Sequence, residues 1–403
     1  MGTPDKSVLM RAIEAHKGGR FAEAEAGYRR VLRQRPGDAD ALNFLGMMRV
    51  QTGELGQGLE LLRRSVKSQP RNAHAWTNLG NALTASGALD EAIKAFRTAT
   101  DLAPTMPEAW FNRGVCARQL KEAEEALECF RKAVEHGPGY AAAYDALARL
   151  LYRARRHAEA AEIYRKWLAC DPDNPTARHM LAASTGENVP SRAGDAYVAD
   201  MFDAFADTFD ENLHDLGYRA PQLLADAVAT KLKARLEAAP ASLDILDAGC
   251  GTGLCGPLLE PMARTLIGVD LSAGMLEKAR ARDVYDELVV EELSTFMRQR
   301  PDSVDLIVSA DTLVYFGALE EPLAAAYQCL REGGLAAFTL ERLEPAADAP
   351  AYRIEPHGRY SHQESYLRAV LAEVGFTAAS IAGDTLRREG SGQVAGHVVL
   401  AVK

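Results

Sequence analysis

The sequence predicts two domains of different fold class, an all-α helical solenoid followed by an α/β domain with a doubly wound, mainly parallel sheet. Prolines stand exactly one period apart, every 34 residues, at Pro36, Pro70, Pro104, Pro138 and Pro172. A constant period of this length is typical of helical repeats that stack on one another. In the second half of the chain, short apolar runs alternate with helical stretches, which is typical of parallel strands joined by helices.

Counting back from each proline divides the first half into repeats at 5–38, 39–72, 73–106, 107–140 and 141–174. The third repeat shows the pattern of small and large residues most clearly, with Trp76, Leu79, Gly80, Leu83, Ala92, Phe96, Ala99 and Pro104. This pattern resembles the tetratricopeptide repeat (TPR), which implies that each unit is a pair of antiparallel helices. A solenoid must cover its last apolar face, so we expect a capping helix at 175–184 and a domain spanning 1–184.

Asn78 and Asn112 occupy the same place, the sixth residue of their repeats, on the first helix of each pair. The first helices of such repeats form the concave face of the solenoid. Repeated side-chain amides there can hydrogen-bond an extended peptide backbone. We therefore expect this face to bind a protein or peptide. The alternatives are that these amides contact only water, or that the surface serves docking or homodimerisation.

The second domain is expected at 196–403, after a segment at 185–195 whose Gly, Pro and Ser content indicates a linker. Its sheet should have seven strands. The last two lack a crossover helix between them, so they should form an antiparallel pair at the C-terminus. The expected strands lie at 243–249, 265–270, 286–292, 304–310, 335–341, 376–389 and 392–403.

A glycine-rich turn follows the first of these strands, in the stretch "DAGCGTGL". Gly249, Gly251 and Gly253 would let a ligand approach the backbone, and a helix expected to open at Leu254 would offer unpaired N–H groups. The dinucleotide fingerprint would need a glycine at position 254. The leucine found there disfavours a nicotinamide enzyme.

With Asp247 just ahead of the glycines, this stretch resembles motif I of the class I S-adenosylmethionine-dependent methyltransferases. "GVDLSAGMLEKAR" and "SADTLVYFG" resemble that family's second and fourth motifs, so the resemblance covers most of 196–403. It implies a Rossmann-like fold and S-adenosylmethionine as cofactor, with Asp247 on the cofactor ammonium and Asp270 on the ribose hydroxyls. The cofactor-binding residues it implies are Asp247, Gly249, Cys250, Gly251, Gly253, Asp270, Leu271, Met275, Glu292, Leu293 and Arg219.

Two of these assignments, and the segment ahead of the first strand, have a plainer alternative. Glu292 takes the place of an adenine-binding Asp, but it could instead cap the following helix. Arg219 could bind the cofactor carboxylate or form a surface salt bridge. The segment 196–215, with Tyr197, Met201, Phe205 and Phe209 at four-residue spacing, could be a lid over the cofactor or an ordinary helix docked on the sheet.

Candidate catalytic residues lie after the fourth and fifth strands, where a methyl acceptor should approach. They are Asp311, Tyr315, Tyr360 and His362, with His357, Arg387 and His397 as weaker candidates. The stretch around Gly358–His362 resembles bacterial methyltransferases fused to repeats. Ser361 and Glu364 have capping-box spacing, however, which would make His362 a surface residue in the first turn of a helix.

Charge and composition exclude several classes of function. The formal charge is −10 for the chain, and it divides into +5 for 1–185 and −15 for 186–403. The acidic half is a poor match for nucleic acid. No apolar run is long enough to span a membrane, and six scattered cysteines without a CxxC pair argue for a cytoplasmic protein with neither disulfides nor a metal site.

These observations favour a methyltransferase acting on a protein or peptide that the repeats recruit. One alternative is a small-molecule methyltransferase whose repeats serve docking or dimerisation. The other is a non-catalytic scaffold that binds S-adenosylmethionine.

Overall fold

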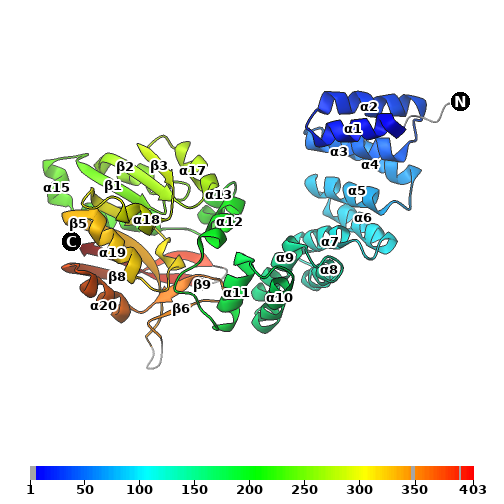
Figure 1. Cartoon of the computed structure of the whole chain (residues 1–403). Coiled ribbons are helices and arrows are strands. Elements are labelled where there is room, and N and C mark those ends of the chain that lie inside the picture. The colour runs from blue at the N-terminus through cyan, green and yellow to red at the C-terminus, as the bar shows by residue number, and fades with distance from the viewer. Residues whose placement is uncertain (1–5, 346–349, 390–391) are drawn as a thin grey trace. The chain divides into compact units, whose positions relative to one another are not determined.

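The computed structural model describes residues 6–345, 350–389 and 392–403. The chain divides into two compact units, Met1–Pro172 and Asp173–Lys403 (Figure 1). Both predicted fold classes are confirmed, because the first unit is helical and the second is built on a mainly parallel sheet. The first position of the first predicted repeat, residue 5, lies outside the described residues.

Helix pairs in the first unit follow the 34-residue period. In the third repeat, the side chain of Asn72 caps α5 by accepting a hydrogen bond from the backbone N–H of Ala75 at 3.2 Å. The turn to α6 contains Gly87, whose φ of +77° is a conformation that favours glycine. The helices are α1 (Lys6–Lys17), α2 (Phe21–Gln34), α3 (Ala39–Gln51), α4 (Leu55–Ser68), α5 (Ala73–Ala85), α6 (Leu89–Leu102), α7 (Pro107–Gln119), α8 (Ala123–His136), α9 (Ala141–Arg153) and α10 (His157–Cys170).

Within a pair, a glycine on one helix faces an aromatic ring on the other. A Cβ placed on Gly80 would lie 2.5 Å from the ring of Phe96, and one on Gly114 would lie 2.7 Å from the ring of Phe130. Both phenylalanines are fully buried. The small residues therefore allow the close helix approach that the repeat pattern predicts.

The second unit contains one sheet with the strand order β3-β2-β1-β4-β5, continued at the far edge of β5 by β9 and then β8. The first five are parallel, and β9 runs antiparallel to both β5 and β8. These seven strands correspond to the seven predicted, and a short pair, β6 and β7, is added beyond the end of β5. The strands are β1 (Leu243–Ala248), β2 (Ala263–Asp270), β3 (Glu287–Val290), β4 (Val304–Ser309), β5 (Leu330–Arg342), β6 (Tyr352–Ile354), β7 (Tyr360–His362), β8 (Ala378–Glu389) and β9 (Gly392–Val402).

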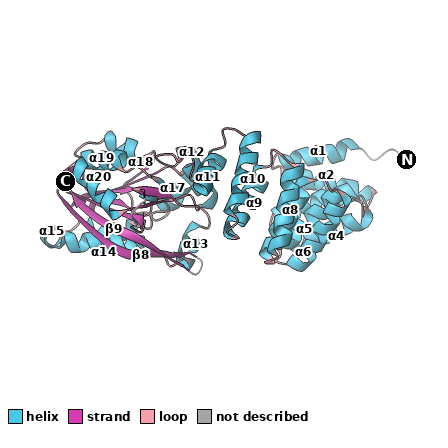
Figure 2. Ribbon diagram, turned by 90° about the horizontal axis from the view of Figure 1, so that it is seen from below, coloured by secondary structure: helices cyan, strands magenta, loops and turns pink. Residues whose placement is uncertain are grey.

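Helices cover both faces of this sheet (Figure 2). On one face, α18 (Leu293–Arg298), α19 (Glu320–Cys329) and α20 (Glu364–Val374) pack on alternate residues of the central strands, such as Leu246 and Ile307. On the other face, α14 (Ala220–Lys231) and α16 (Gly256–Leu259) pack on the residues between them. This alternation buries both faces of the strands, which explains their continuous apolar runs. The remaining helices are α11 (Pro175–Thr185), α12 (Asp195–Phe205), α13 (Phe209–Asp215), α15 (Lys233–Ala238) and α17 (Ala273–Arg280), with 3-10 turns η1 (Glu260–Met262) and η2 (Leu313–Tyr315).

Two helices differ from their predictions. The helix after the glycine-rich turn begins at Gly256, not at Leu254, because residues 251–255 form consecutive turns. It has only four residues, so it contributes less of a helix N-terminus than expected. The predicted single helix at 196–215 is two helices, α12 and α13, separated by a turn at 206–208.

The segment before α12 is held against the second unit. Ala193 donates to the backbone carbonyl of Tyr315 at 2.7 Å, and the carbonyl of Ser191 accepts from Gly317 and Ala318 at 2.8 Å each. The predicted linker at 185–195 is therefore ordered on this side. The helix predicted at 175–184 forms as α11, and within the second unit its His179 stacks on Tyr197 of α12 with ring centroids 4.2 Å apart.

Candidate active site

The glycine-rich turn after β1 adopts a backbone that only glycine accommodates easily. Gly249, Gly251 and Gly253 have φ values of +78°, +55° and +81°. A Cβ on Gly249 would lie 2.2 Å from the side chain of Thr312, whereas one on Gly251 would meet open space. The turn thus packs closely on the end of β4 at one glycine and leaves room for a ligand at the next. Cys250 between them is buried.

Asp270 ends β2 beside this turn, as its spacing predicts. One carboxylate oxygen accepts from the backbone N–H of Gly251 at 2.9 Å and the other from Ser272 at 2.8 Å. Burial raises the pKa of Asp270, although these backbone donors oppose the rise. Each oxygen keeps a free lone pair, so the carboxylate can still accept two hydroxyl donors from a ribose. Leu271 is half-buried and Met275 fully buried beside it.

Asp247, the last acid before the glycines, is buried and only partly hydrogen-bonded. Its side chain is 1% exposed, and the hydroxyl of Tyr285 donates to one oxygen, Oδ2, at 2.7 Å. The other oxygen, Oδ1, is buried and has no partner in the described part of the chain. Burial raises the pKa of Asp247 to about 7, and the Tyr285 hydrogen bond only partly opposes this. An orphaned buried oxygen is costly, so the site is built for a donor such as an ammonium group.

The acidic side chains of the α12–α13 segment tie it to the glycine-rich turn and to α17. Asp203 accepts hydrogen bonds from Ser272 and Gly274 at the start of α17. Asp210 accepts from Thr252 in the glycine-rich turn. Asp207 pairs with Lys278 at 2.7 Å. These acids therefore position the segment on the glycine-rich turn and on α17.

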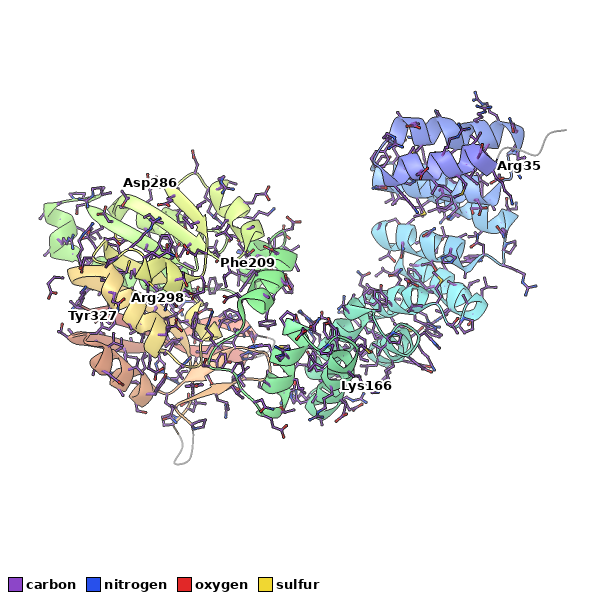
Figure 3. The ribbon with its side chains drawn as sticks, viewed as in Figure 1. Arg35, Lys166, Phe209, Asp286, Arg298 and Tyr327 are labelled. Carbon is purple, nitrogen blue, oxygen red and sulfur yellow. The ribbon has the colours of Figure 1, made fainter. Side chains whose placement is uncertain are left out.

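Aromatic contacts of this segment differ from the predicted face. Phe202, which was outside the predicted set, contacts Tyr315 with ring centroids 5.5 Å apart and Phe209 at 5.8 Å. Phe209, labelled in Figure 3, opens α13, while Phe205 is 38% exposed. The break at 206–208 shifts the helical phase between α12 and α13, so Phe209 does not continue the α12 face that carries Tyr197 and Met201.

Two residues expected to bind the cofactor, Glu292 and Arg219, instead make the contacts of their alternative roles, a helix cap and a salt bridge. The carboxylate of Glu292 caps α18, because it accepts from the backbone N–H groups of Ser294 and Thr295 at 3.0 and 2.8 Å. Leu293 follows it and is buried. Arg219 forms a half-exposed salt bridge with Asp384 at 2.7 Å. Both residues remain near the pocket, but their charged groups are already partnered.

At the carboxyl ends of β4 and β5, acidic and arginine side chains form a closed network, which we call the acid–arginine ring. Arg387 of β8 donates to Asp311, to Glu341 and, at 3.0 Å, to Glu389. Arg359 donates to Glu341 at 2.6 Å and also to Glu389. Asp311 has a positive φ of +53° and accepts from the hydroxyl of Thr339 at 2.8 Å. The candidate Asp311 and the weaker candidate Arg387 thus belong to one site.

Tyr218 stands next to this ring and was not among the predicted site residues. The backbone around it pairs with β8, because Arg219 donates to the carbonyl of Leu386 and Arg388 donates to that of Leu216, each at 2.8 Å. Burial and the nearby charge of Asp311 raise its pKa well above the usual range. Its hydroxyl has no hydrogen-bond partner among the described residues. Only its place directly before Arg219 could have drawn attention to it in the sequence.

His362 and Tyr360 belong to β7, which pairs with the carboxyl end of β5, but their side chains contact backbone carbonyls and not the acid–arginine ring. The predicted helix start was wrong, because Ser361 and His362 belong to β7, which pairs with β5 and β6, and α20 begins only at Glu364. The ring of His362 is fully buried, with Nε2 3.0 Å from the carbonyl of Gly317, and burial lowers its pKa to about 4. The hydroxyl of Tyr360 donates to the carbonyl of Pro190 at 2.8 Å. Both side chains therefore stabilise the fold around the site.

In the first unit, Asn78 and Asn112 are both half-buried on the first helices of their pairs. The amide of Asn78 donates to the side-chain oxygen of Asn43 at 3.1 Å, which leaves its own oxygen available as an acceptor.

His357, a weaker candidate, lies beside the acid–arginine ring with Nε2 3.4 Å from Glu341. His397 is buried in β9. In the described residues, no group of three or more His, Cys, Asp or Glu side chains could hold a metal ion.

Models of two known families match parts of this chain. Residues 246–338 match the model described as a methyltransferase domain, and 9–64, 49–107, 90–141 and 122–175 match that described as a tetratricopeptide repeat. Methyltransferase domains of this class take S-adenosylmethionine as methyl donor. Among the described helices, none is both long and apolar enough to cross a membrane.

Curated relatives match only part of the second unit. Methyltransferase-like protein 27 of Homo sapiens is 35% identical over 122 residues, 30% of this chain and 46% of its own. Malonyl-[acyl-carrier protein] O-methyltransferase of Yersinia pestis is 33% identical over 24% of this chain and 35% of its own. Trans-aconitate 2-methyltransferase of Paracidovorax citrulli is 32% identical over 29% and 46%. The chain thus spans less than half the length of these relatives.

Solved structures align with the first unit at lower similarity. A structure described as the functional characterisation of pilF from Pseudomonas aeruginosa is 23% identical, covers 44% of this chain and 81% of its own, and has a TM-score of 0.40.

Proposed function

Since this chain joins tetratricopeptide repeats to a methyltransferase domain, we propose that it transfers a methyl group from S-adenosylmethionine to a protein or peptide that the repeats recruit. The observation that carries the first half of this proposal is Asp247. A buried carboxylate oxygen without a partner, directly before three glycines of positive φ, fits the ammonium of the cofactor's methionine part.

Other residues beside Asp247 fit the ribose of the cofactor. Gly251 leaves space against the backbone, and Asp270 keeps lone pairs for both ribose hydroxyls. Asp203 and Asp210 attach α12 and α13 to the edge of this pocket, so the segment can exclude water from it. When bound, the cofactor supplies an electrophilic methyl group on a sulfonium. The protein then has to align the acceptor with that methyl group, at the ends of β4 and β5.

The repeats support a macromolecular acceptor. Side-chain amides at equivalent positions, Asn78 and Asn112, can hydrogen-bond an extended backbone without reading its sequence. Holding the acceptor on the same chain as the catalytic unit raises its local concentration, with no new contact at the reacting atoms.

The names of two relatives favour a second candidate, because malonyl-[acyl-carrier protein] and trans-aconitate are acids and the latter is a small molecule. In that case the repeats would serve docking or dimerisation. A non-catalytic scaffold remains the third candidate.

Calorimetric titration with S-adenosylhomocysteine tests the cofactor site. We expect the full chain to bind and Asp270→Ala to lose at least tenfold in affinity, since a ribose contact of this kind contributes about 1.4 kcal/mol or more. The exposed Asp226→Asn on α14 is the control. Equal binding by Asp270→Ala would contradict the assignment.

Methyl-labelled S-adenosylmethionine then separates the candidates. Label in proteins or peptides, reduced in Asn78→Ala/Asn112→Ala but not in the control Thr98→Ala, supports recruitment by the repeats. Label only in small molecules favours the second candidate. Cofactor binding without any label favours the scaffold.

A further inference from the structure

The acid–arginine ring at the ends of β4 and β5 is more buried than a surface salt bridge, and its charged groups are joined in one network. The side chains of Arg387 and Glu341 are only 5% and 6% exposed, and those of Asp311 and Arg359 are 14% and 20% exposed. Glu389, at 36%, is the most open member. Burying a charged group costs several kcal/mol unless the group is paired. A ring of five such groups is therefore not explained by a contribution to stability alone.

The charges of the ring do not cancel. Three carboxylates, Asp311, Glu341 and Glu389, face the guanidinium groups of Arg359 and Arg387. Although burial opposes ionisation, the two arginines lower the pKa values of Glu341 and Glu389.

The other titratable groups beside the ring do not correct this imbalance. Burial lowers the pKa of His357, so its imidazole is neutral at pH 7. Burial also raises the pKa of Tyr218 and, to about 12, that of Tyr315, so both phenols are neutral. With all three carboxylates ionised, one negative charge is therefore left over in a poorly solvated place, and burial accordingly raises the pKa of Asp311, the ring carboxylate that most readily takes up a proton.

The ring also lies on the acceptor side of the cofactor pocket. Tyr218 lies beside the ring, because the next residue, Arg219, donates its backbone N–H to the carbonyl of Leu386, the neighbour of Arg387. Besides burial, the charges of Asp311 and Asp247 both contribute to raising the pKa of Tyr218. No hydrogen bond of its hydroxyl is found among the described residues, and Oδ1 of Asp247 is buried without a partner there.

We propose that the acid–arginine ring and Tyr218 form the acceptor site, and that it takes a primary amine of the kind a lysine side chain carries. This inference rests on the proposed methyl transfer. An ammonium group would compensate the leftover negative charge and donate to the free hydroxyl of Tyr218. A carboxylate acceptor would add a second uncompensated charge, and both arginines are already occupied. The acceptor class thus differs from the acids in the names of the two bacterial relatives.

The chemistry balances with groups already present. The ammonium first gives one proton to a ring carboxylate, and Asp311 is suited to accept it because burial raises its pKa. The nitrogen lone pair of the neutral amine then attacks the methyl carbon. The N–C bond forms as the C–S bond breaks, and the C–S electron pair stays on sulfur. The products are S-adenosylhomocysteine and the protonated N-methylated amine.

The test uses the full chain, methyl-labelled S-adenosylmethionine and a synthetic peptide library that presents lysine, aspartate, glutamate and serine side chains. Methyl esters release labelled methanol in mild alkali, whereas methylated amines keep their label. Alkali-stable label recovered as methyl-lysine after acid hydrolysis supports the proposal. Volatile label overturns it, and so does the absence of label from every lysine-containing pool.

Two variants link the result to the ring. We expect Glu389→Gln, a change at the most exposed member of the ring, to lower kcat/KM for lysine peptides about 10- to 100-fold. We expect Asp311→Asn to lower kcat more than KM. Glu344→Gln, which removes an exposed carboxylate paired with Arg342 outside the ring, is the control. Affinity for S-adenosylhomocysteine should stay within about threefold in all three. If the unaltered chain does not bind S-adenosylhomocysteine, the proposed function itself is refuted. Unchanged kinetics in both ring variants would refute only the amine site.

Discussion

Raising the pH from about 6 to about 8 should strengthen the binding of S-adenosylhomocysteine, because the site needs Asp247 as a carboxylate. Burial raises the pKa of Asp247 to about 7, so much of it is protonated below that pH. The cofactor's ammonium requires the ionised form. If the bound state holds Asp247 ionised, the fraction ready to bind grows about tenfold between these pH values, which is about 1.4 kcal/mol.

Isothermal titration calorimetry at several pH values measures this change directly, together with the proton released on binding. The Tyr285→Phe variant gives an internal check. It removes the hydroxyl that donates to Oδ2 at 2.7 Å and stabilises the carboxylate. The pKa of Asp247 should then rise further, and the pH midpoint should move up by about one unit.

Asp247→Asn should bind weakly and show no pH dependence over this range, whereas the exposed Asp226→Asn should behave like the unaltered chain. An affinity that stays constant from about pH 6 to 8 would refute the role of Asp247. So would a midpoint that moves down in Tyr285→Phe. In the free chain, the same raised pKa should lower the stability of the fold as pH rises from about 4 to 7, because the unfolded chain ionises first.

Three further substitutions test the packing that positions the sites. Gly249→Ala should abolish cofactor binding and cost about 2–4 kcal/mol in urea unfolding, since its Cβ would lie 2.2 Å from Thr312 at a φ of +78°; wild-type stability would contradict this packing. His179→Ala should lower the melting temperature of the second unit by removing the 2.7 Å hydrogen bond with the carbonyl of Gly358, about 1–3 kcal/mol; an unchanged melt would show that bond to be dispensable. Phe130→Ala should cost about 3–5 kcal/mol and affect only the helical transition followed by circular dichroism; a shift in the other transition would contradict independent units.

The sequence alone determined the two fold classes and the cofactor loop. A 34-residue period requires stacked units, since no single helix pair can bury its apolar face. The pocket was also predictable, because its parts follow strands at fixed distances along the chain. Gly249 and Gly251 directly follow β1, and Asp270 ends β2, the parallel neighbour that brings it to the same edge.

Short motifs with two structural solutions could not be resolved from the sequence. Glu292 could cap a helix or bind adenine, and the cap is what forms, because Ser294 and Thr295 present two backbone donors to it. The capping-box spacing of Ser361 and Glu364 predicted a helix start. Strand pairing with β5 and β6 instead makes Ser361 part of β7, since tertiary hydrogen bonds outweigh a local preference.

Only the tertiary structure decided the acceptor side of the site. Asp311, Glu341, Arg359 and Arg387 come from four separate segments, and they meet because β5 pairs with β7 and β9, and β9 with β8. Tyr218 joins them through backbone hydrogen bonds to β8, which leave no trace in the sequence. Contacts made by a strand and the turn that follows it can be predicted from residue spacing along the sequence. A network of charges between distant segments depends on register and burial, which exist only once the chain has folded.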